Sequence, residues 1–350
     1  MDPNLTEDVQ ARARRLVEEL DPDADPRTAL ELVGAALGML DDRPDPLDLK
    51  IAAAAMTEMR EAFRLFAGYR DIQKVTVFGS ARTRPDDPLY AQAEHIASAL
   101  AERGWMVVTG AGPGIMQAAM EGAGRAHSIG VAIRLPFEQG ANPVIAGDEK
   151  YVSMKYFFTR KLMLVKESRA FVCLPGGFGT LDETFELLTL TQTGKGLPVP
   201  IVLLDTPEEP FWPRIDDLIR ELLVDRGLVA AADTSLYRVT DSVEAACAEI
   251  DRFYANYHSI RYVGDFLIVR LQHEPTDDQL AELNQRFAHL VARGRIERSL
   301  PLDIERRHRD HVELPRIRFA FSRHRSGDLR ALIDALNEFV PPAGTEPEPG

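Results

Sequence analysis

The spacing of hydrophobic residues changes along the chain and divides it into segments. Up to Ala67, apolar residues recur every three or four positions, which predicts helices over Thr6–Leu20, Pro26–Leu40 and Pro46–Ala67. Asp and Pro residues separate these stretches, as is typical of helix starts. Residues 1–68 are therefore expected to form a helical N-terminal extension, and they show no grouping of catalytic residue types.

Beyond Tyr69, short and nearly continuous apolar runs alternate with helical patterns. The predicted strands are Lys74–Phe78, Trp105–Thr109, Ile129–Ile133, Ala170–Leu174 and Val199–Leu204. The predicted helices are Pro88–Arg103, Gly114–His127, Lys155–Glu167, Thr180–Thr193, Phe211–Asp225 and Ser242–Tyr257. Strands that are apolar on both faces and alternate with helices indicate a parallel sheet covered on both sides. The predicted fold class is α/β, with a doubly wound, Rossmann-like parallel sheet in a catalytic domain over residues 69–257.

The remaining segment has a different order of elements. Strands are predicted over Tyr262–Arg270 and Arg316–Phe321, and helices over Asp277–Ala292 and Asp328–Phe339. We therefore expect a small α+β domain over residues 258–340. Residues 341–350 are rich in Pro and Glu, which predicts a disordered tail.

Composition excludes several classes of protein. The chain has 350 residues, of which 45% are hydrophobic and 27% are charged, as in ordinary globular proteins. A net charge of −14 argues against a protein that coats nucleic acid. The apolar runs are far shorter than the ~20 residues of a membrane span, and the first ten residues are too acidic and polar for a signal peptide. Two cysteines, Cys173 and Cys247, cannot form a disulfide framework, and this favours a cytoplasmic location.

Basic residues gather in two places. The stretch Lys150–Lys166 contains four lysines and Arg160 but no acid, so it is either a solvated helix face or a surface directed at a small anion. Residues 293–330 contain 11 arginines and 6 acids. RNA binding is one interpretation of that segment, but arginines without interleaved aromatic residues are more typical of a salt-bridged surface. Our hypothesis for the segment is that it clasps the acidic N-terminus of the same or a neighbouring subunit.

Three glycine-bearing loops follow predicted strands, where parallel sheets bind their ligands. Glycine lets the backbone turn tightly and approach a ligand, and the next helix offers free N–H groups and a partial positive charge to an anion. Glycines at such junctions also serve close helix–strand packing, and this interpretation stays open for each loop. The candidate binding residues are Gly79 and Ser80 in the first loop, Gly110, Gly112, Gly114 and Met116 in the second, and Gly176, Gly177, Gly179 and Thr180 in the third.

The loops favour a mononucleotide phosphate over a dinucleotide. The second loop reads G-x-G-x-G, with Ile115 where a dinucleotide fingerprint has its last glycine. The next predicted strand ends without an acid to bind a ribose diol, although Arg134 suits a 2′-phosphate. No P-loop pattern and no cluster with metal-ligand spacing occurs, so neither a cofactor nor a metal is expected.

The third loop supplies a candidate acid. Thr180 and Glu183 match a capping box, which is a structural interpretation of both residues. Glu183 is also expected in the first helical turn, where the helix dipole favours its ionised form, with Glu186 on the same face. A carboxylate beside a phosphate site can stabilise a cationic sugar transition state. Arg160 and Lys161, on the preceding helix, are candidates for holding the anion.

At Pro175–Glu183 the sequence reads P-G-G-F-G-T-L-D-E, and Arg160-Lys161 precedes it as an R-K pair. With the order of the two earlier loops, this pattern resembles the Lonely Guy (LOG) family of phosphoribohydrolases, often described as lysine decarboxylases. The resemblance covers about Tyr69–Tyr257. It implies hydrolysis of the N-glycosidic bond of nucleoside 5′-monophosphates, such as AMP or N6-modified AMP, to free base and ribose 5-phosphate.

The same resemblance assigns roles to residues. It implies Arg160 and Glu183 as the catalytic pair, a phosphate held by the third glycine loop and Thr180, and no cofactor. The expected partners are a small nucleotide and further copies of the chain in a homo-oligomer, with neither membrane nor nucleic acid. The released base, and the roles of the N- and C-terminal extensions, stay open. The alternatives are a non-catalytic nucleotide sensor or carrier, an NADP-linked oxidoreductase based on Arg134, and a pyridoxal-phosphate decarboxylase using Lys161.

Overall fold

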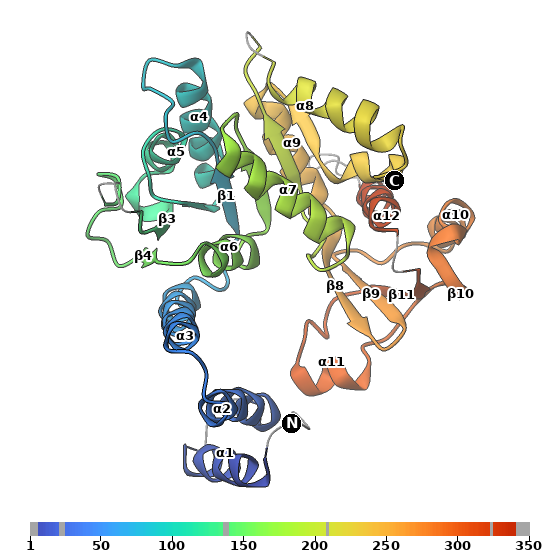
Figure 1. The fold of residues 1–350 in the computed structure, drawn as a ribbon. Coiled ribbons are helices and arrows are strands. Elements are labelled where there is room, and N and C mark those ends of the chain that lie inside the picture. Colours follow the sequence, from blue (N-terminus) through green and yellow to red (C-terminus); the bar gives the residue numbers. More distant parts are fainter. Residues whose placement is uncertain (1–5, 21–24, 136–139, 208–209, 323–324, 341–350) are drawn as a thin grey trace. The chain divides into compact units, whose positions relative to one another are not determined.

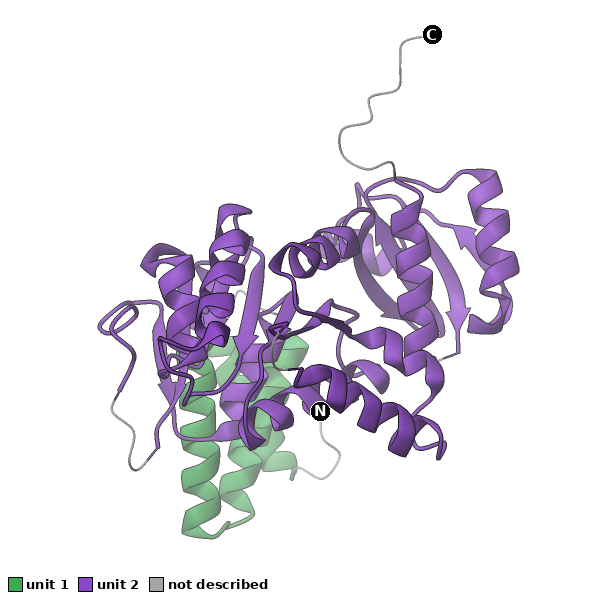
Figure 2. Cartoon of the chain, turned by 90° about the horizontal axis from the view of Figure 1, so that it is seen from above, with its two compact units in different colours: residues 1–63 green, residues 64–350 purple. Residues whose placement is uncertain are grey.

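The structure is a computed structural model that describes residues 6–20, 25–135, 140–207, 210–322 and 325–340. The chain divides into two compact units, residues 1–63 and residues 64–350 (Figure 2). The predicted tail, residues 341–350, lies outside the described residues. Within the described part of the chain, no helix combines the length and the apolar character that crossing a membrane requires.

The first unit is helical, as its periodicity predicts. It contains α1 (Glu7–Leu20), α2 (Pro26–Asp41) and most of α3 (Pro46–Ala67), each within one residue of its predicted bounds. Asp25 caps α2, because its carboxylate accepts a hydrogen bond of 3.0 Å from the backbone N–H of Thr28. Asp-Pro pairs therefore mark the helix starts here, since Pro fits the first helical turn.

The second unit begins with a seven-stranded parallel sheet in the order β4-β3-β2-β1-β5-β6-β7 (Figure 1). This confirms the predicted doubly wound α/β fold. The strand order reverses at β1, so the carboxyl ends of β1 and β5 flank the crevice where such sheets bind ligands. The strands are β1 (Lys74–Phe78), β2 (Met106–Thr109), β3 (Ser128–Ile133), β4 (Tyr151–Met154), β5 (Ala170–Cys173), β6 (Ile201–Leu204) and β7 (Arg238–Thr240).

Helices cover both faces of this sheet. On one face, the core joins apolar strand residues such as Val75 and Val172 to α4 (Pro88–Glu102), α5 (Ile115–Ala123) and α9 (Val243–Phe253). On the opposite face, the Thr76 hydroxyl donates a 3.0 Å hydrogen bond to the Leu164 carbonyl of α6 (Phe157–Lys166). The remaining elements are α7 (Phe178–Gln192), α8 (Trp212–Leu218), the 3-10 segments Arg125–His127 and Ala231–Leu236, and the π-helical segment Ile219–Val224.

A four-stranded antiparallel sheet, in the order β10-β11-β9-β8, completes the second unit. Its core side faces α10 (Asp277–Arg286) and α12 (Ser326–Glu338), and α11 (Asp303–His308) precedes its last strand. The strands are β8 (Tyr257–Val263), β9 (Phe266–Leu271), β10 (Val291–Arg298) and β11 (Arg316–Phe321), and a 3-10 turn covers Ala288–Leu290.

Two predictions for this region are wrong. The single strand predicted over Tyr262–Arg270 is the hairpin of β8 and β9, which turns at Gly264, where φ is +59° and glycine is favoured. The helix predicted to reach Ala292 ends at Arg286, and the chain then forms β10. The turn interrupts the apolar pattern only at Gly264 and Asp265, and β10 contains only three apolar residues, so the spacing of apolar residues did not separate these elements.

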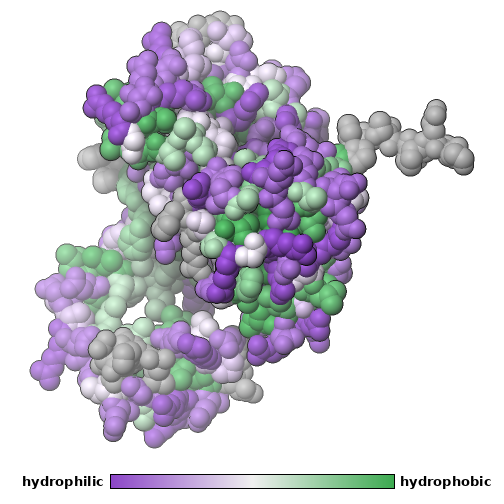
Figure 3. All heavy atoms as spheres, turned by 90° about the vertical axis from the view of Figure 1, so that its right-hand side faces the viewer, coloured by the Kyte–Doolittle hydropathy of each residue, from purple (hydrophilic) through white to green (hydrophobic). Residues whose placement is uncertain are grey.

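Three arginines of β10 and β11 pair with acids of the same unit. Arg293 contacts Asp265, Arg298 contacts Asp277 and Arg318 contacts Glu297 at N–O distances of 2.9, 2.6 and 2.8 Å. Figure 3 shows one face of the molecule, on which hydrophilic residues lie around hydrophobic areas. These pairs agree with the interpretation of the segment as a salt-bridged surface.

Candidate active site

The three glycine loops lie together at the carboxyl ends of β1, β2 and β5. The backbone N–H of Ser80 donates to the Pro175 carbonyl at 3.2 Å, and the N–H of Ile115 donates to the Ser80 carbonyl at 3.0 Å. The first loop therefore bridges the other two, and one cavity can be lined by all three.

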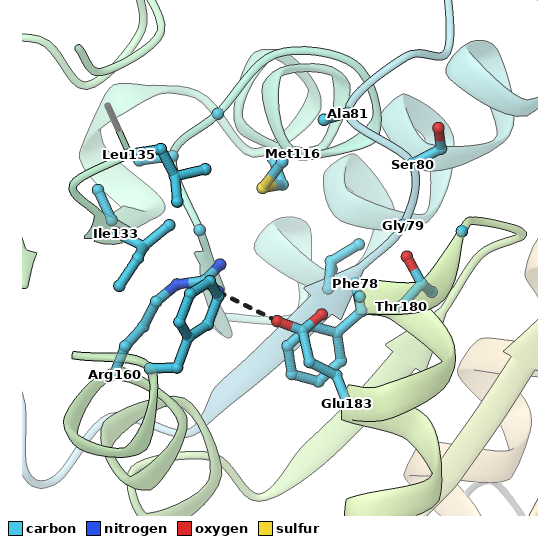
Figure 4. A pocket seen from close by; sticks show the side chains of 18 of the residues that line it. Phe78, Gly79, Ser80, Ala81, Met116, Ile133, Leu135, Arg160, Thr180 and Glu183 are labelled. Atoms are coloured by element: carbon cyan, nitrogen blue, oxygen red, sulfur yellow. Dashed lines mark hydrogen bonds and ion pairs between the residues drawn. The ribbon is translucent and has the colours of Figure 1, made fainter. Parts of the chain in front are cut away.

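A cavity of about 860 Å³ opens between these loops, α6 and α7 (Figure 4). Most residues selected from the sequence line it: Gly79, Ser80, Gly110, Gly112, Met116, Arg160, Gly177, Gly179, Thr180 and Glu183. Its volume lies in the range of small-molecule sites. Sequence positions more than 100 residues apart thus contribute to one pocket.

Three selected residues are not among the residues that line the cavity: Gly114, Gly176 and Lys161. A Cβ at Gly114, where φ is +67°, would lie 2.4 Å from the Ser80 carbonyl oxygen, and a Cβ at Gly176 would lie 2.2 Å from the Thr180 Oγ1. For these two glycines, the packing interpretation describes the observed geometry, because only glycine lets the loops approach so closely.

Arg160 and Glu183 face each other in the pocket (Figure 4). Arg160 Nη1 lies 3.2 Å from Glu183 Oε1, and Arg160 Nε donates a 3.1 Å hydrogen bond to the Val131 carbonyl. Only 9% and 13% of the two side chains are exposed. Gly110 makes room for the guanidinium, since a Cβ there would lie 2.2 Å from Arg160 Nη2. The arginine is therefore fixed from two sides and keeps further N–H donors for a ligand.

The predicted capping box is wrong. Helix α7 begins at Phe178, its N-cap is Gly177, and no side chain caps it. Thr180 is thus the third residue of the helix and Glu183 the sixth, so Glu183 lies in the second turn. Glycine occupies the cap position, so no side chain caps the first N–H groups of α7, and Gly177, Gly179 and Thr180 line the cavity.

Burial is the main influence on Glu183. It raises the pKa of this carboxyl group above its usual value, and the positive charges of Arg160 and Lys161 oppose the rise. The helix dipole, expected to favour the ionised form from the first turn, acts on Glu183 from the second turn of α7. Near the pH where it titrates, such a group can exchange a proton with a substrate or a water molecule.

The other basic residues near the site differ in what they contact. Lys161 contacts Asp182 and Glu186, and Lys150 contacts Asp148, so the stretch Lys150–Lys166 is not one anion-binding surface. Two arginines that were not selected as site residues line the cavity, Arg82 after the first loop and Arg134 after β3. Arg82 follows the Gly79-Ser80 pair by two positions, a signal that could have identified it.

Apolar side chains also line the cavity. Ile133 and Leu135 lie on the side opposite Ser80, Gly79 and Thr180, with the Arg160–Glu183 pair between the two sides (Figure 4). Among the described residues, no three His, Cys, Asp or Glu side chains gather in an arrangement that could hold a metal ion.

Comparisons with known proteins cover this part of the chain. A family model described as "Possible lysine decarboxylase" matches residues 114–250. Cytokinin riboside 5′-monophosphate phosphoribohydrolase LOG of Oryza sativa subsp. japonica is 34% identical to this chain over 45% of the chain's length. The match spans 66% of that relative, slightly under two thirds of its length. The Mycobacterium marinum cytokinin riboside 5′-monophosphate phosphoribohydrolase is 30% identical over 48% of this chain and 87% of its own.

Among solved structures, the Moco carrier protein from Chlamydomonas reinhardtii is similar to this chain. It is 21% identical, and the match covers 52% of this chain and 96% of that one with a TM-score of 0.36.

Proposed function

The chain belongs to the LOG family of cytokinin riboside 5′-monophosphate phosphoribohydrolases, and on this premise we propose that it hydrolyses the N-glycosidic bond of nucleoside 5′-monophosphates. The products are a free base and ribose 5-phosphate. The observation that carries the proposal is a buried arginine–carboxylate pair beside an uncapped helix N-terminus in one cavity.

The phosphate is assigned to the glycine side of the cavity. Gly177, Gly179, Thr180 and Ser80 line it there, and the first N–H groups of α7 have no acceptor within the helix. A helix N-terminus with free N–H groups and a partial positive charge favours a phosphate. Arg82 adds a positive charge on the same cavity.

The ribose is assigned to the centre and the base to the apolar side. With the phosphate near Thr180, the Arg160–Glu183 pair lies between it and the wall formed by Ile133 and Leu135 (Figure 4). Binding energy from the phosphate holds the sugar in place for reaction.

The chemistry follows glycoside hydrolysis through an oxocarbenium-like transition state. As the bond from C1′ to the base nitrogen breaks, positive charge develops on the ribose, and the ionised Glu183 offsets it and orients the ribose hydroxyls or the attacking water. The water oxygen bonds to C1′, one of its protons is released, and the base leaves with a proton. Arg160 holds Glu183 in position.

An assay over a panel of nucleotides tests this function. We expect incubation with AMP, N6-isopentenyl-AMP, CMP or UMP to release free base and ribose 5-phosphate from at least one of them, as measured by chromatography. The nucleotide that reacts fastest identifies the base preference. Micromolar binding by calorimetry without release of any base would contradict the hydrolase and favour the nucleotide sensor or carrier.

The position of Lys161 argues against a pyridoxal-phosphate decarboxylase. Lys161 is the lysine such a reaction would use, yet its ammonium contacts two carboxylates and it does not line the cavity. Burial lowers the pKa of Lys161, but the hydrogen bonds to Asp182 and Glu186 raise it overall. A strongly protonated amine is a poor nucleophile for a Schiff base.

Substituting Gly110 with alanine tests the fit of the guanidinium. The new Cβ would meet Arg160 Nη2 at 2.2 Å and would displace it, so we expect a fall in kcat/KM of roughly 10- to 100-fold. Steady-state kinetics measures the effect. The control is Gly68→Ala, whose Cβ would meet only the Leu65 carbonyl at 3.7 Å and should leave the rate unchanged. Equal rates in Gly110→Ala and the wild type would show that the position of Arg160 is not critical.

We also propose that the protein acts in the cytoplasm as a homo-oligomer. Cys173 and Cys247 are free and buried, which suits a reducing compartment. Exposed apolar side chains beside the cavity, Phe157, Phe158 and Leu162 on α6 and Phe178 on α7, support contact with another copy.

A further inference from the structure

Lys161 joins two helices instead of facing the cavity. Its Nζ lies 2.6 Å from Asp182 Oδ2 and 2.7 Å from Glu186 Oε2, both on α7, while Lys161 itself is on α6. The lysine side chain is only 16% exposed. An ammonium held by two carboxylates at these distances has few donors left for a ligand, because it has three N–H groups.

The ion pairs of Lys161 lie next to the ion pair of Arg160 and Glu183 along α6 and α7. Arg160 and Lys161 are consecutive on α6, but a helix rotates by about 100° per residue, so they leave it in different directions. Glu183, the partner of Arg160, lies between Asp182 and Glu186 in the sequence of α7. Lys161 therefore contacts α7 at two positions, one turn apart on one face of the helix, that precede and follow Glu183 in the sequence.

We propose that Lys161 is a positioning residue, which through Asp182 and Glu186 fixes α7 against α6 so that the Glu183 carboxylate is held beside Arg160. It acts through Glu183 and does not bind the substrate. This inference rests on the proposed function for its kinetic test, but its geometry does not depend on which nucleotide is bound.

The arrangement also has an electrostatic consequence. The groups that act on Glu183 are Arg160 and Lys161 from α6 and Asp182 from its own helix, and the Cys173 thiol of β5 lies nearby. Arg160 and Lys161 lower the pKa of Glu183, which burial has raised, and Asp182 raises it. Removal of Lys161 and removal of Asp182 should therefore shift this pKa in opposite directions.

Steady-state kinetics separates positioning from binding. For Lys161→Met we expect kcat to fall roughly 10- to 100-fold with KM almost unchanged, because the ground-state contacts to the nucleotide stay intact. Lys161→Arg should restore part of the rate, since Arg can still reach both carboxylates. The matched control is Lys166→Met on the same helix, because Lys166 pairs with its neighbour Glu167 and does not line the cavity. A rise in KM at unchanged kcat would show that Lys161 binds substrate and would overturn the proposal.

The pH profile adds a readout that loss of folding does not produce. We expect the acid limb of log kcat/KM to move to higher pH in Lys161→Met and to lower pH in Asp182→Asn. Glu186→Gln should reduce kcat without a comparable shift, because Glu186 is not among the main influences on the pKa of Glu183. Shifts in the same direction in the first two variants would contradict the inference.

A titration without turnover keeps the inference separate from the proposed function. In protein labelled with 13C at the glutamate carboxyl carbon, the Glu183 resonance is identified by its loss in Glu183→Gln. Its titration midpoint should move upward in Lys161→Met and stay in place in Lys166→Met. An inactive wild type with this upward shift would refute the hydrolase but support the positioning role. An unmoved midpoint would refute the positioning role even in an active enzyme.

Discussion

The Glu183→Gln variant is expected to release base about 10³-fold more slowly than the wild type, the order of loss for removing a positioned acid–base or charge-stabilising group. Glutamine keeps the size of the side chain and can accept a hydrogen bond from Arg160, so the cavity should keep its shape. What is lost is the negative charge that offsets the developing charge on the ribose. Quenched-flow or long-time chromatographic assays measure the rate.

Two controls accompany this variant. Glu121→Gln carries the same substitution on α5, where Glu121 bonds to Tyr90 and Gln117 away from the cavity, and its rate should equal that of the wild type. Nucleotide affinity by calorimetry and the circular dichroism spectrum should be preserved in Glu183→Gln. Full activity in this variant would remove Glu183 from the mechanism.

The pH dependence of the wild type follows from the same residue. Since burial raises the pKa of Glu183, its active ionised form is lost as the pH falls through a value above the ordinary glutamate pKa. The effect on stability has the corresponding sign. The folded state holds this proton more tightly than the unfolded chain, so Glu183 favours folding at low pH, and that contribution is lost as the pH rises through the raised pKa.

The Glu305→Ala variant is expected to destabilise the C-terminal sheet by about 3–5 kcal/mol. Glu305 of α11 is fully buried, and its Oε1 lies 2.7 Å from Arg270 Nη2 and 2.8 Å from Arg316 Nη1. Both arginine side chains are almost completely buried, so truncation of the acid leaves two cations without this partner in a region of low dielectric constant. Hydrogen exchange of the β9 and β11 amides measures the loss locally, because global unfolding of a chain with several units need not be two-state.

Glu297 of β10 provides the control. Glu297 pairs with Arg318, but 39% and 36% of these side chains are exposed, so Glu297→Ala should cost less than about 1 kcal/mol. Base release by the folded fraction of Glu305→Ala should be normal, since Glu305 does not line the cavity. A change of less than 1 kcal/mol in Glu305→Ala would show that the buried arginines find other partners.

The stability that Glu305 provides also depends on pH. Burial alone would raise its pKa, but the Leu302 N–H and the neighbouring arginines lower it overall. A depressed pKa means that the contribution is present above the unfolded-state value and is lost as the pH falls through the folded-state value. This direction is opposite to that of Glu183.

The sequence by itself determined the fold class and the positions of the loops. The strands Lys74–Phe78 and Arg316–Phe321 were predicted with their observed bounds. Burial of a strand, on one face or on both, leaves a pattern of apolar residues within the strand itself, and the sequence shows this pattern directly. The sequence also predicted that the glycine loops follow the carboxyl ends of parallel strands, where such sheets bind ligands. The hairpin of β8 and β9 was missed because its turn interrupts an apolar pattern only at Gly264 and Asp265.

Only the tertiary structure decided where each residue of the site lies and what it contacts. Arg160 and Lys161 are adjacent and both cationic in the sequence, yet one enters the cavity and the other joins α6 to α7. Gly110 makes room for a guanidinium and Gly176 for a threonine, although both are simply glycines after a strand. The physical reason is that periodicity and turn chemistry are set by neighbours in the chain. The direction of a side chain and the atoms it meets are set instead by the packing of segments that are distant in sequence.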